Sequence, residues 1–336
     1  MNAENGTQSI KVRENLYELK QHGSLDYPVG VYRIDLNKMY LGQVHWHWHE
    51  ELEYILVTSG TASFFAGDSS YVLSQGQGML INRNVLHSVK ALNEGNCIFY
   101  SIVFHTSFLF GYRHSELAVN YLLPLTNHER LRCFPLNAPG TEKDPEISQL
   151  LDMCSQIVQV NEEKAFGYEL LTKSLLLQTW VILLKKIEDY KSASPQEPKA
   201  SVSPDEARAK AAITYISMHY AEQISLQDIA DYIHISKSEC CRCFKRCLQT
   251  TPFEYLIKYR IYSAASMFGQ ADQRLSVSDV AAKVGFNSSS YFNKLFKKYL
   301  GCTPTQFKRQ INGNGEMLSY ILGTHIEADP TFQLPT

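Results

Sequence analysis

Apolar residues recur at two different spacings along this 336-residue chain, and the spacing changes from one region to the next. In residues 29–104, runs rich in Val, Ile, Tyr and Phe alternate with polar residues and are broken by glycines. Successive side chains of a strand point to opposite faces, so this alternation is typical of half-buried strands. The region therefore predicts about six to eight short antiparallel strands, closed into a sandwich or barrel.

Helical spacing replaces the alternation from about residue 146 to residue 190. Two helices are expected here, the second over residues 166–189. Their apolar positions are Ile147, Leu150, Leu151, Cys154 and Ile157, then Leu170, Leu171, Leu175, Trp180, Ile182 and Leu183. A face of Leu, Ile and Trp with no partner inside its own domain marks an interface, so we expect these helices to form the contact of a homodimer.

The rest of the chain is punctuated by prolines and glycines. Residues 191–204 contain three prolines and no regular apolar spacing, which predicts a linker. Residues 205–310 are helical again, and the polar residues 311–336 predict a poorly ordered tail. We therefore predict an α+β chain with two domains. Residues 20–190 would form an antiparallel β-barrel with trailing helices, and residues 205–310 an all-α domain.

The predicted all-α domain contains an internal duplication. Residues 225–252 (SLQDIADYIHISKSECCRCFKRCLQTTP) align with residues 276–304 (SVSDVAAKVGFNSSSYFNKLFKKYLGCTP). Matched residues lie 51 positions apart before the turn, as Asp228 and Asp279 do, and 52 apart after it. The second copy therefore holds one extra residue in its turn. Each copy contains two short amphipathic segments joined tightly, which predicts two helix-turn-helix units.

Capping signals place the ends of these short helices. Ser225 and Ser276 each precede an aspartate by three residues, and Ser236 precedes Glu239 in the same way. Such pairs form capping boxes at helix N-termini. Gly285 lies where the second turn requires a left-handed residue.

A capped helix is also expected between the two copies, over residues 251–268, with Thr251 as N-cap and Pro252 at its first position. Its length is about 27 Å, and major grooves on one face of DNA repeat every ~34 Å. One chain could therefore place two reading helices in adjacent grooves.

Polar and basic residues remain on the outward face of the second helix of each unit, as a helix that reads the major groove requires. Residues 204–310 hold 15 Lys and Arg against 9 Asp and Glu, whereas the whole chain has a formal net charge of −2. We therefore expect double-stranded DNA as the partner of this domain. The candidate contact residues are Ser238, Cys241, Arg242, Lys245, Ser289, Ser290, Asn293, Lys294 and Lys297.

Residues 281–308, AAKVGFNSSSYFNKLFKKYLGCTPTQFK, resemble the C-terminal signature of the AraC/XylS family of transcription regulators. The resemblance covers about residues 204–309. By position it implies base contacts for Ser238, Cys241 and Arg242 in the first copy, and for Ser289, Ser290 and Lys294 in the second. The first copy departs from the family pattern, because Gln249 replaces the usual glycine and Lys237 a frequent proline.

Four of the eight cysteines, Cys240, Cys241, Cys243 and Cys247, crowd one predicted helix. Cys240, Cys243 and Cys247 share its inward face, where core packing explains them better than a metal or redox site. Zinc ligands usually come from a turn together with a second element. Cys241 faces outward at a candidate base-contact position, where a thiol switch is the alternative interpretation.

Histidines and a glutamate form the second informative motif, in HWHWHEELEYILVTSG, residues 45–60. His47, His49 and Glu53 read H-x-H-x-x-x-E, and His87 follows His47 by forty residues. In a strand, His47 and His49 point to one side, and Trp46 and Trp48 to the other. Three imidazoles and a carboxylate in the mouth of a barrel could hold a divalent metal.

Residues 29–104 resemble the cupin fold, whose metal-binding members have their ligands at the positions of these four residues. Asn82 and Asn84 stand where the second cupin motif commonly has proline and glycine. Cupin domains of AraC-type regulators usually resemble effector pockets without a metal, frequently for sugars. An effector pocket would be lined by His47, His49, Glu53, His87, Trp46 and Trp48. Three interpretations stay open: an organic effector pocket, a metal-assisted pocket, and a structural role for the histidines.

These features together predict a sequence-specific transcription regulator rather than an enzyme. Its DNA binding or activation would be controlled by a sugar or other polar metabolite in the cupin barrel, with RNA polymerase as a further partner if it activates. The rival interpretations are a cupin enzyme fused to a targeting module, and a nucleoid-type DNA binder without a ligand. The N-terminus has no apolar run, and no segment is long enough to cross a bilayer. We therefore expect a cytoplasmic protein with no membrane partner.

Overall fold

The computed structural model describes most of the chain, in two compact units. The described residues are 12, 16–39, 42–67, 69–92, 97–111, 115–126, 131–136, 144–193, 204–269 and 275–311. Most of the predicted linker, 191–204, and nearly all of the predicted tail, 311–336, lie outside them. One unit comprises residues 21–37 and 48–203, and the other comprises residues 204–336 together with 1–20 and 38–47.

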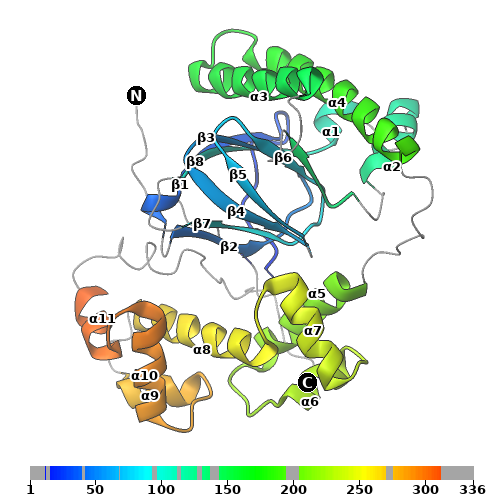
Figure 1. Cartoon of the computed structure of the whole chain (residues 1–336). Coiled ribbons are helices and arrows are strands. Elements are labelled where there is room, and N and C mark those ends of the chain that lie inside the picture. The colour runs from blue at the N-terminus through cyan, green and yellow to red at the C-terminus, as the bar shows by residue number, and fades with distance from the viewer. Residues whose placement is uncertain are drawn as a thin grey trace. The chain divides into compact units, whose positions relative to one another are not determined.

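Two antiparallel sheets form the N-terminal architecture (Figure 1). The strands are β1 (Val29–Asp35), β2 (Gln43–His47), β3 (Leu52–Ser59), β4 (Thr61–Ala66), β5 (Ser69–Ser74), β6 (Gly78–Ile81), β7 (His87–Ala91), β8 (Ile98–Phe104) and β9 (Cys133–Leu136). One sheet has the order β1-β8-β3-β6-β9 and the other β2-β7-β4-β5. The strands β1 to β8 fill residues 29–104, which confirms the predicted cupin-like antiparallel fold.

The burial of each strand follows its place in the sheets. In β4, every second residue is buried, because one face of the strand packs inward. In β3 the first six residues are all buried, because it is the central strand of its sheet and helix α3 (Pro145–Glu163) packs on it. Asp144 begins α3 as N-cap by accepting a hydrogen bond from the Glu146 N–H at 2.9 Å. Buried residues of the β1-β8-β3-β6-β9 sheet and of α3 belong to one core.

Helix α4 (Tyr168–Ala193) packs antiparallel to α3 by its contacts and order in the chain (Figure 1). Trp180, Ile182 and Leu183 of α4 are buried in the core that α3 and β3 share. The Trp180 Nε1–H donates to the Tyr121 carbonyl oxygen at 2.9 Å. The prediction that these three residues form a dimer face is therefore wrong, because all three belong to the core of their own unit. Short elements after β8 contribute to this core: α1 (Ser107–Phe110), η3 (Ala118–Leu122) and α2 (Leu123–Thr126).

Seven helices form the described part of the second unit beyond residue 203. They are α5 (Pro204–His219), α6 (Leu226–Tyr232), α7 (Lys237–Leu248), α8 (Pro252–Gly269), α9 (Val277–Lys283), α10 (Ser289–Leu300) and α11 (Pro304–Ile311). The pairs α6–α7 and α9–α10 are the two predicted helix-turn-helix units, and both pack against α8 (Figure 1). The inward residues of α9 and α10 form a single core with α8.

The two turns and the two helix C-termini use left-handed residues at equivalent positions. Gly285 has φ +84°, as predicted, and His234 takes the same place in the first turn with φ 55°. After the reading helices, Gly301 has φ 74° and Gln249 has φ 53°. The first copy therefore holds two non-glycine residues in a conformation that costs an L-residue about 1–2 kcal/mol.

A buried arginine of α8, Arg260, joins the connection between α5 and α6 to the turn of the second helix-turn-helix unit. Its Nε donates to the Tyr220 carbonyl oxygen at 2.7 Å and its Nη2 to that of Glu222 at 2.6 Å. The guanidinium lies 5.8 Å from the ring centre of Phe286, beside Gly285. We call this arrangement the Arg260 clamp.

Candidate functional site

The predicted reading residues lie on the outward faces of α7 and α10. Eight of the nine candidates are exposed, and Cys241 is half-buried. The inward faces are apolar and buried, with Cys240, Cys243 and Phe244 in α7 and Phe292 and Phe296 in α10. This division arises because the 3.6-residue period places the apolar residues of each helix on one side. Each helix therefore presents a polar surface that could enter a groove of DNA.

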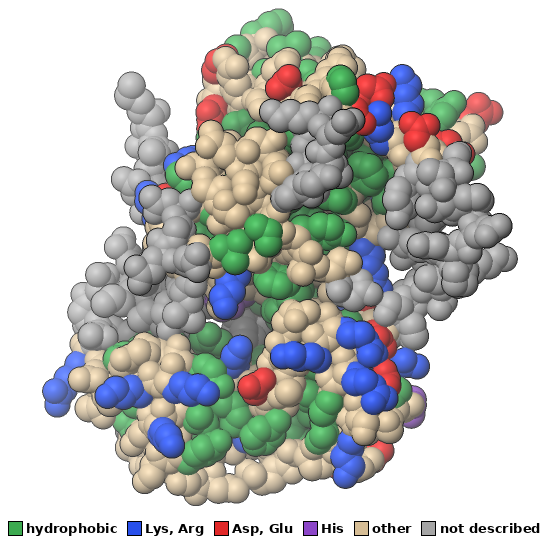
Figure 2. All heavy atoms as spheres, viewed as in Figure 1, with side chains coloured by type: hydrophobic (Ala, Val, Ile, Leu, Met, Phe, Trp, Pro, Cys, Tyr) green, Lys and Arg blue, Asp and Glu red, His purple; other side chains and the backbone are tan. Residues whose placement is uncertain are grey.

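Charge differs between the two outward faces. Helix α10 carries Lys294, Lys297 and Lys298 and no carboxylate, whereas α7 carries Glu239 among its basic residues. Lys and Arg side chains outnumber Asp and Glu on the visible face of the helical unit (Figure 2). Two side chains on these helices were not predicted as part of the outward faces: Tyr291, exposed at 48%, and the half-buried Glu239, which was predicted only as a capping residue. The sequence did not indicate that Tyr291 is exposed, because an aromatic residue in a short amphipathic helix is usually expected in the core.

The cysteines of α7 are packed, as their spacing predicts. Cys240, Cys243 and Cys247 are fully buried, and the Cys243 thiol donates to the Asp205 carbonyl oxygen at 3.1 Å. Burial raises the pKa of the Cys240 thiol to about 11. A thiol that stays protonated is a poor nucleophile and a poor metal ligand, which favours the packing interpretation.

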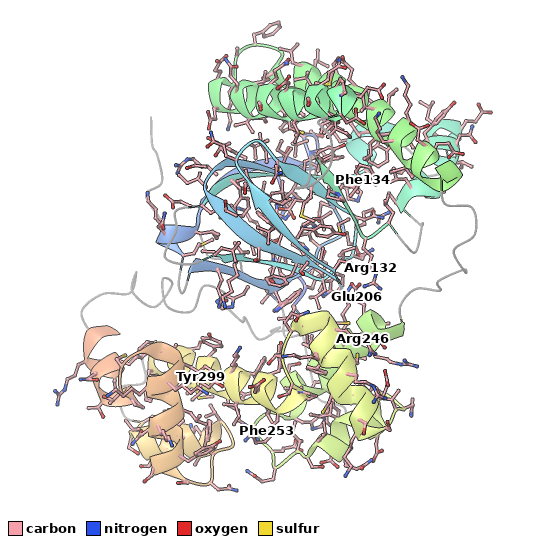
Figure 3. The ribbon with its side chains drawn as sticks, in the orientation of Figure 1. Arg132, Phe134, Glu206, Arg246, Phe253 and Tyr299 are labelled. Atoms are coloured by element: carbon pink, nitrogen blue, oxygen red, sulfur yellow. The ribbon has the colours of Figure 1, made fainter. Side chains whose placement is uncertain are left out.

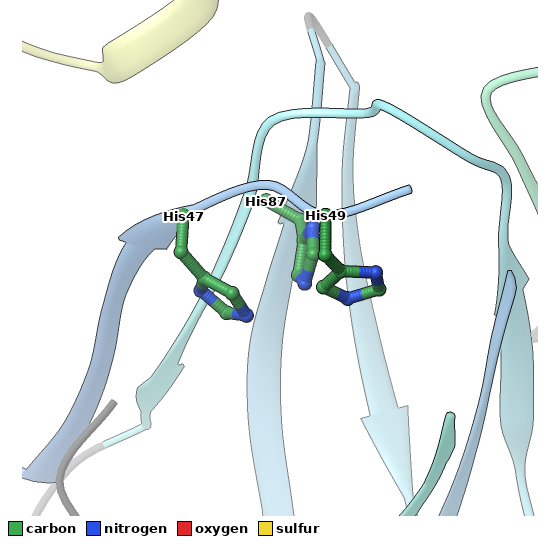
Figure 4. A group of neighbouring side chains, drawn as sticks. All are labelled: His47, His49 and His87. Atoms are coloured by element: carbon green, nitrogen blue, oxygen red, sulfur yellow. The ribbon is translucent and has the colours of Figure 1, made fainter. Parts of the chain in front are cut away.

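The histidine cluster consists of His47, His49 and His87 (Figure 4). The three side chains are buried, and each offers a ring nitrogen within 4.8 Å of those of the others. His47 ends strand β2, His49 follows it, and His87 begins β7. Glu53 of β3 joins the cluster, with its Oε2 atom 3.1 Å from His87 Nε2 and 3.5 Å from His49 Nε2. The structure thus brings together the four residues that the motif spacing singled out.

Hydrogen bonds fix the orientation of these rings. The Nδ1 atoms of His47 and His87 lie 2.8 Å from the carbonyl oxygens of His45 and Val85. A carbonyl oxygen only accepts, so each Nδ1 is the donor. The Glu53 Oε1 atom accepts from the Ser101 hydroxyl at 2.5 Å. Burial alone would raise the pKa of Glu53, but His49 and His87 outweigh it and hold that pKa well below its usual range.

Further polar groups, which the sequence did not indicate, border the cluster. The His22 ring lies 5.5 Å from that of His49, and its Nδ1 atom is 3.1 Å from the Tyr32 hydroxyl. The Glu18 Oε2 atom lies 3.9 Å from His47 Nε2. His22 and Glu18 come from segments before β2. Their proximity to His49 and His47 is seen only in the folded structure.

Trp46 and Trp48 are half-buried and alternate with the buried His47 and His49, as predicted. By strand alternation they face away from the cluster, so their place in an effector pocket stays a prediction.

The chain matches two family models. One describes an AraC-like ligand-binding domain and covers residues 29–179, and the other describes a helix-turn-helix domain and covers residues 229–310. Among the described residues, no helix combines the length and the apolar character that a membrane crossing requires.

Several regulators are similar to the chain. An uncharacterized HTH-type transcriptional regulator of Bacillus subtilis, YdeC, is 28% identical over 89% of this chain and 97% of its own. An uncharacterized HTH-type transcriptional regulator from the cgkA 5' region of Pseudoalteromonas carrageenovora is 32% identical, over 39% of this chain and 77% of its own. Among solved structures, an apo form of ToxT from Vibrio cholerae aligns with a TM-score of 0.37 and 12% identity, over 87% of this chain and 100% of its own. Both curated relatives carry the name of a transcriptional regulator. The chain belongs to the AraC family of transcription regulators, with an AraC-like ligand-binding domain ahead of two helix-turn-helix units.

Proposed function

We propose that a small polar effector binds at the histidine cluster and thereby controls how α7 and α10 engage an operator sequence. The observation that carries this proposal is the cluster itself: three buried imidazoles around a buried carboxylate, with Nδ1 of His47 and His87 held by backbone carbonyls. Ligand pockets combine an apolar lining with a few convergent polar groups that fix the ligand's orientation. An effector with several hydroxyl groups, such as a sugar, could exchange hydrogen bonds with imidazoles and a carboxylate. A fatty acid chain offers no such groups.

Thermal unfolding of the full chain tests the effector. A ligand at one hundred times its Kd stabilises the folded protein by about 2.7 kcal/mol. Sugars, sugar acids, aromatic acids and fatty acids would be compared on the wild type, on His49→Ala and on His105→Ala, a histidine of the same unit outside the cluster. We expect a polar compound to stabilise the wild type and His105→Ala but not His49→Ala. Stabilisation of all three proteins alike, or by fatty acids alone, would contradict the proposal.

A metal-assisted site is the second candidate, and the ligand set favours it. His47, His49, His87 and Glu53 are nitrogen and oxygen donors that suit zinc, iron, nickel or manganese. Metal-ligating histidines usually donate their other ring N–H to a carbonyl or carboxylate, as His47 and His87 do here. These residues fit a divalent ion. When bound, it would act as a Lewis acid that polarises an oxygen of the effector.

Metal analysis of the purified full chain separates the two candidates. Under the metal-assisted interpretation we expect about one equivalent of a divalent metal in the wild type and loss of it in His87→Ala. An organic effector that binds the metal-free protein with unchanged affinity would leave only the first candidate.

The outer face of α4 supports a homodimer through a partly different set of residues, because Leu170 belongs to the predicted face and Leu177 and Val181 do not. Leu170, Leu177 and Val181 are exposed at 75%, 38% and 53%. They follow one another by seven and four positions, which is the spacing of a coiled-coil seam. A second copy of this chain is the occupant that such a seam fits, because a twofold axis pairs identical faces.

Sedimentation of the full chain tests the dimer. We expect Leu177→Glu combined with Val181→Glu to yield a monomer, because two carboxylates would be buried against the partner's seam. Leu171→Glu changes an exposed leucine beside the stripe, at 54% exposure, and should stay dimeric. A wild type that sediments as a monomer at every concentration would refute this interface.

A further inference from the structure

Glu239 of α7 departs from the capping arrangement that four other helices of its domain follow. The acid or amide three residues after the N-cap turns back to the N-cap backbone in four helices, where Ser225, Ser276, Thr251 and Thr303 donate their backbone N–H to Asp228, Asp279, Glu254 and Gln306. In α7 the N-cap Ser236 still accepts from the Glu239 N–H, at 3.2 Å. The Glu239 carboxylate, however, points to two arginines. The predicted capping box is therefore only half formed in α7.

The two arginines that Glu239 contacts are held differently. Glu239 Oε1 accepts from Arg246 Nη2 at 2.6 Å, and Arg246 also donates its Nε to Asp205 Oδ2 at 2.8 Å. Arg246, labelled on α7 in Figure 3, is thus enclosed by two carboxylates and joins α7 to α5. Arg242 donates its Nε to Glu239 Oε2 at 2.8 Å, and its Nη2 to the same oxygen. The Arg242 side chain is still 60% exposed, which leaves its outer N–H groups toward solvent.

The second copy of the repeat has no such arrangement. At the offset of 52, Tyr291 takes the place of Glu239, Lys294 that of Arg242 and Lys298 that of Arg246. Helix α10 contains no carboxylate that could hold a cation in one orientation. The carboxylate–arginine pair therefore belongs to the first reading helix alone.

We infer that Glu239 is a specificity-determining positioning residue, which holds Arg242 for a bidentate contact with the major-groove edge of one guanine. Arginine to the O6 and N7 atoms of guanine is the commonest specific contact to DNA, and it needs a planar fork in a fixed orientation. A side chain already held in the free protein loses less entropy on binding. The Glu239 charge also repels phosphates, which disfavours binding that reads no bases. The inference rests on the proposed entry of α7 into the groove.

Selection from a random double-stranded DNA library by the full chain tests this role. Arg242→Ala first identifies the base pair that Arg242 reads, where the wild type should prefer guanine by about 5- to 150-fold. Glu239→Gln should lower the preference at that same base pair by about 2- to 12-fold and raise affinity for non-specific duplex. Glu239→Asp keeps the charge but shortens the side chain, so it should lower the preference without that rise. Asp231→Asn, an exposed carboxylate of α6, is the charge-matched control and should leave the base preference unchanged.

Three outcomes would overturn the inference. An unchanged preference in Glu239→Gln would show that Arg242 needs no support. A change at a different base pair from the one lost in Arg242→Ala would show that Glu239 itself reads a base, as a carboxylate does with cytosine N4. A wild type that enriches no sequence would overturn the proposed operator recognition as a whole, and this inference with it.

Discussion

Alanine at Gly285 and at Gly301 makes the same chemical change at two left-handed positions, yet we expect very different losses of stability. Both glycines have positive φ, +84° and +74°. The left-handed conformation costs an L-residue about 1–2 kcal/mol, and the stiffer unfolded chain returns roughly 0.4–1 kcal/mol of that. A Cβ at Gly301 would meet nothing within 4 Å. Gly301→Ala should therefore lower the free energy of unfolding by only about 1 kcal/mol.

At Gly285 the Arg260 clamp occupies the space that a Cβ needs. An added Cβ would lie 2.8 Å from the Tyr220 carbonyl oxygen and 2.9 Å from Cζ and Nη2 of Arg260. Arg260 is buried and can move away only by giving up a hydrogen bond to Tyr220 or Glu222. A hydrogen bond to a charged group contributes about 1.5–3 kcal/mol. Adding the loss of one such bond to the backbone strain gives about 2.5–4 kcal/mol for Gly285→Ala.

Urea unfolding of the full-length variants, followed by far-UV circular dichroism and by amide hydrogen exchange in α9 and α10, measures this difference. Tryptophan fluorescence, recorded with both variants in a Trp46→Phe background, is an internal control, because the remaining Trp48 and Trp180 lie in the other compact unit. Its transition should not move in either variant. Equal losses in Gly285→Ala and Gly301→Ala would refute the reasoning, since they would mean that Arg260 moves aside without losing a hydrogen bond.

Three further changes test other parts of the molecule. Gln249→Gly should raise the free energy of unfolding of the helical unit by a few tenths to about 1 kcal/mol, because Gln249 has φ 53°; a lower urea midpoint would contradict this. Lys294→Ala should weaken binding to all duplexes and reduce the slope of log affinity against log salt by about 1; the exposed Lys283→Ala of α9 is its control, and equal slopes in both would remove Lys294 from the interface. Lys186→Met removes the partner of Asp144, whose pKa is lowered from 3.8 by its hydrogen bond with Lys186. This interaction stabilises the folded state above pH 3.8, and its contribution to stability is lost as the pH falls through the lowered pKa of Asp144. The thermal midpoint of the variant should therefore depend less on pH in the acid range, and an unchanged pH profile would argue against this ion pair.

Spacing along the sequence was sufficient to predict the elements that bury one face. Alternation predicted the strands of residues 29–104, and the 3.6-residue period predicted both helix-turn-helix units. Both patterns indicate directly which side chains are buried on folding. Strand β9 (Cys133–Leu136) was not predicted, because four residues are too few to show a period. It is a strand only because β6 pairs with it.

The partner of an apolar face could not be predicted from spacing, because periodicity shows that a face is buried but not which element covers it. Trp180 has the spacing of an interface residue, yet η3, through the Tyr121 carbonyl, covers it. The histidine cluster was predictable as far as His47, His49, Glu53 and His87 share a motif. Ser101 was not, because its contact with Glu53 depends on the register of β3 against β8. Strand register depends on the whole sheet rather than on local sequence.

The two copies of the repeat differ in backbone conformation, in ion pairing and in the charge of their reading helices. The first holds His234 and Gln249 in the left-handed conformation where the second has Gly285 and Gly301, so it carries backbone strain of about 1–2 kcal/mol at each position. Its reading helix is tied to α5 through the side chain of Asp205, and its carboxylate–arginine pair restricts the outward side chains. The second unit has relaxed turns, the Arg260 clamp and a reading helix of lysines without a carboxylate. Mobile lysines contribute charge rather than orientation. The salt dependence of operator binding should therefore follow α10, and the base preference should follow α7.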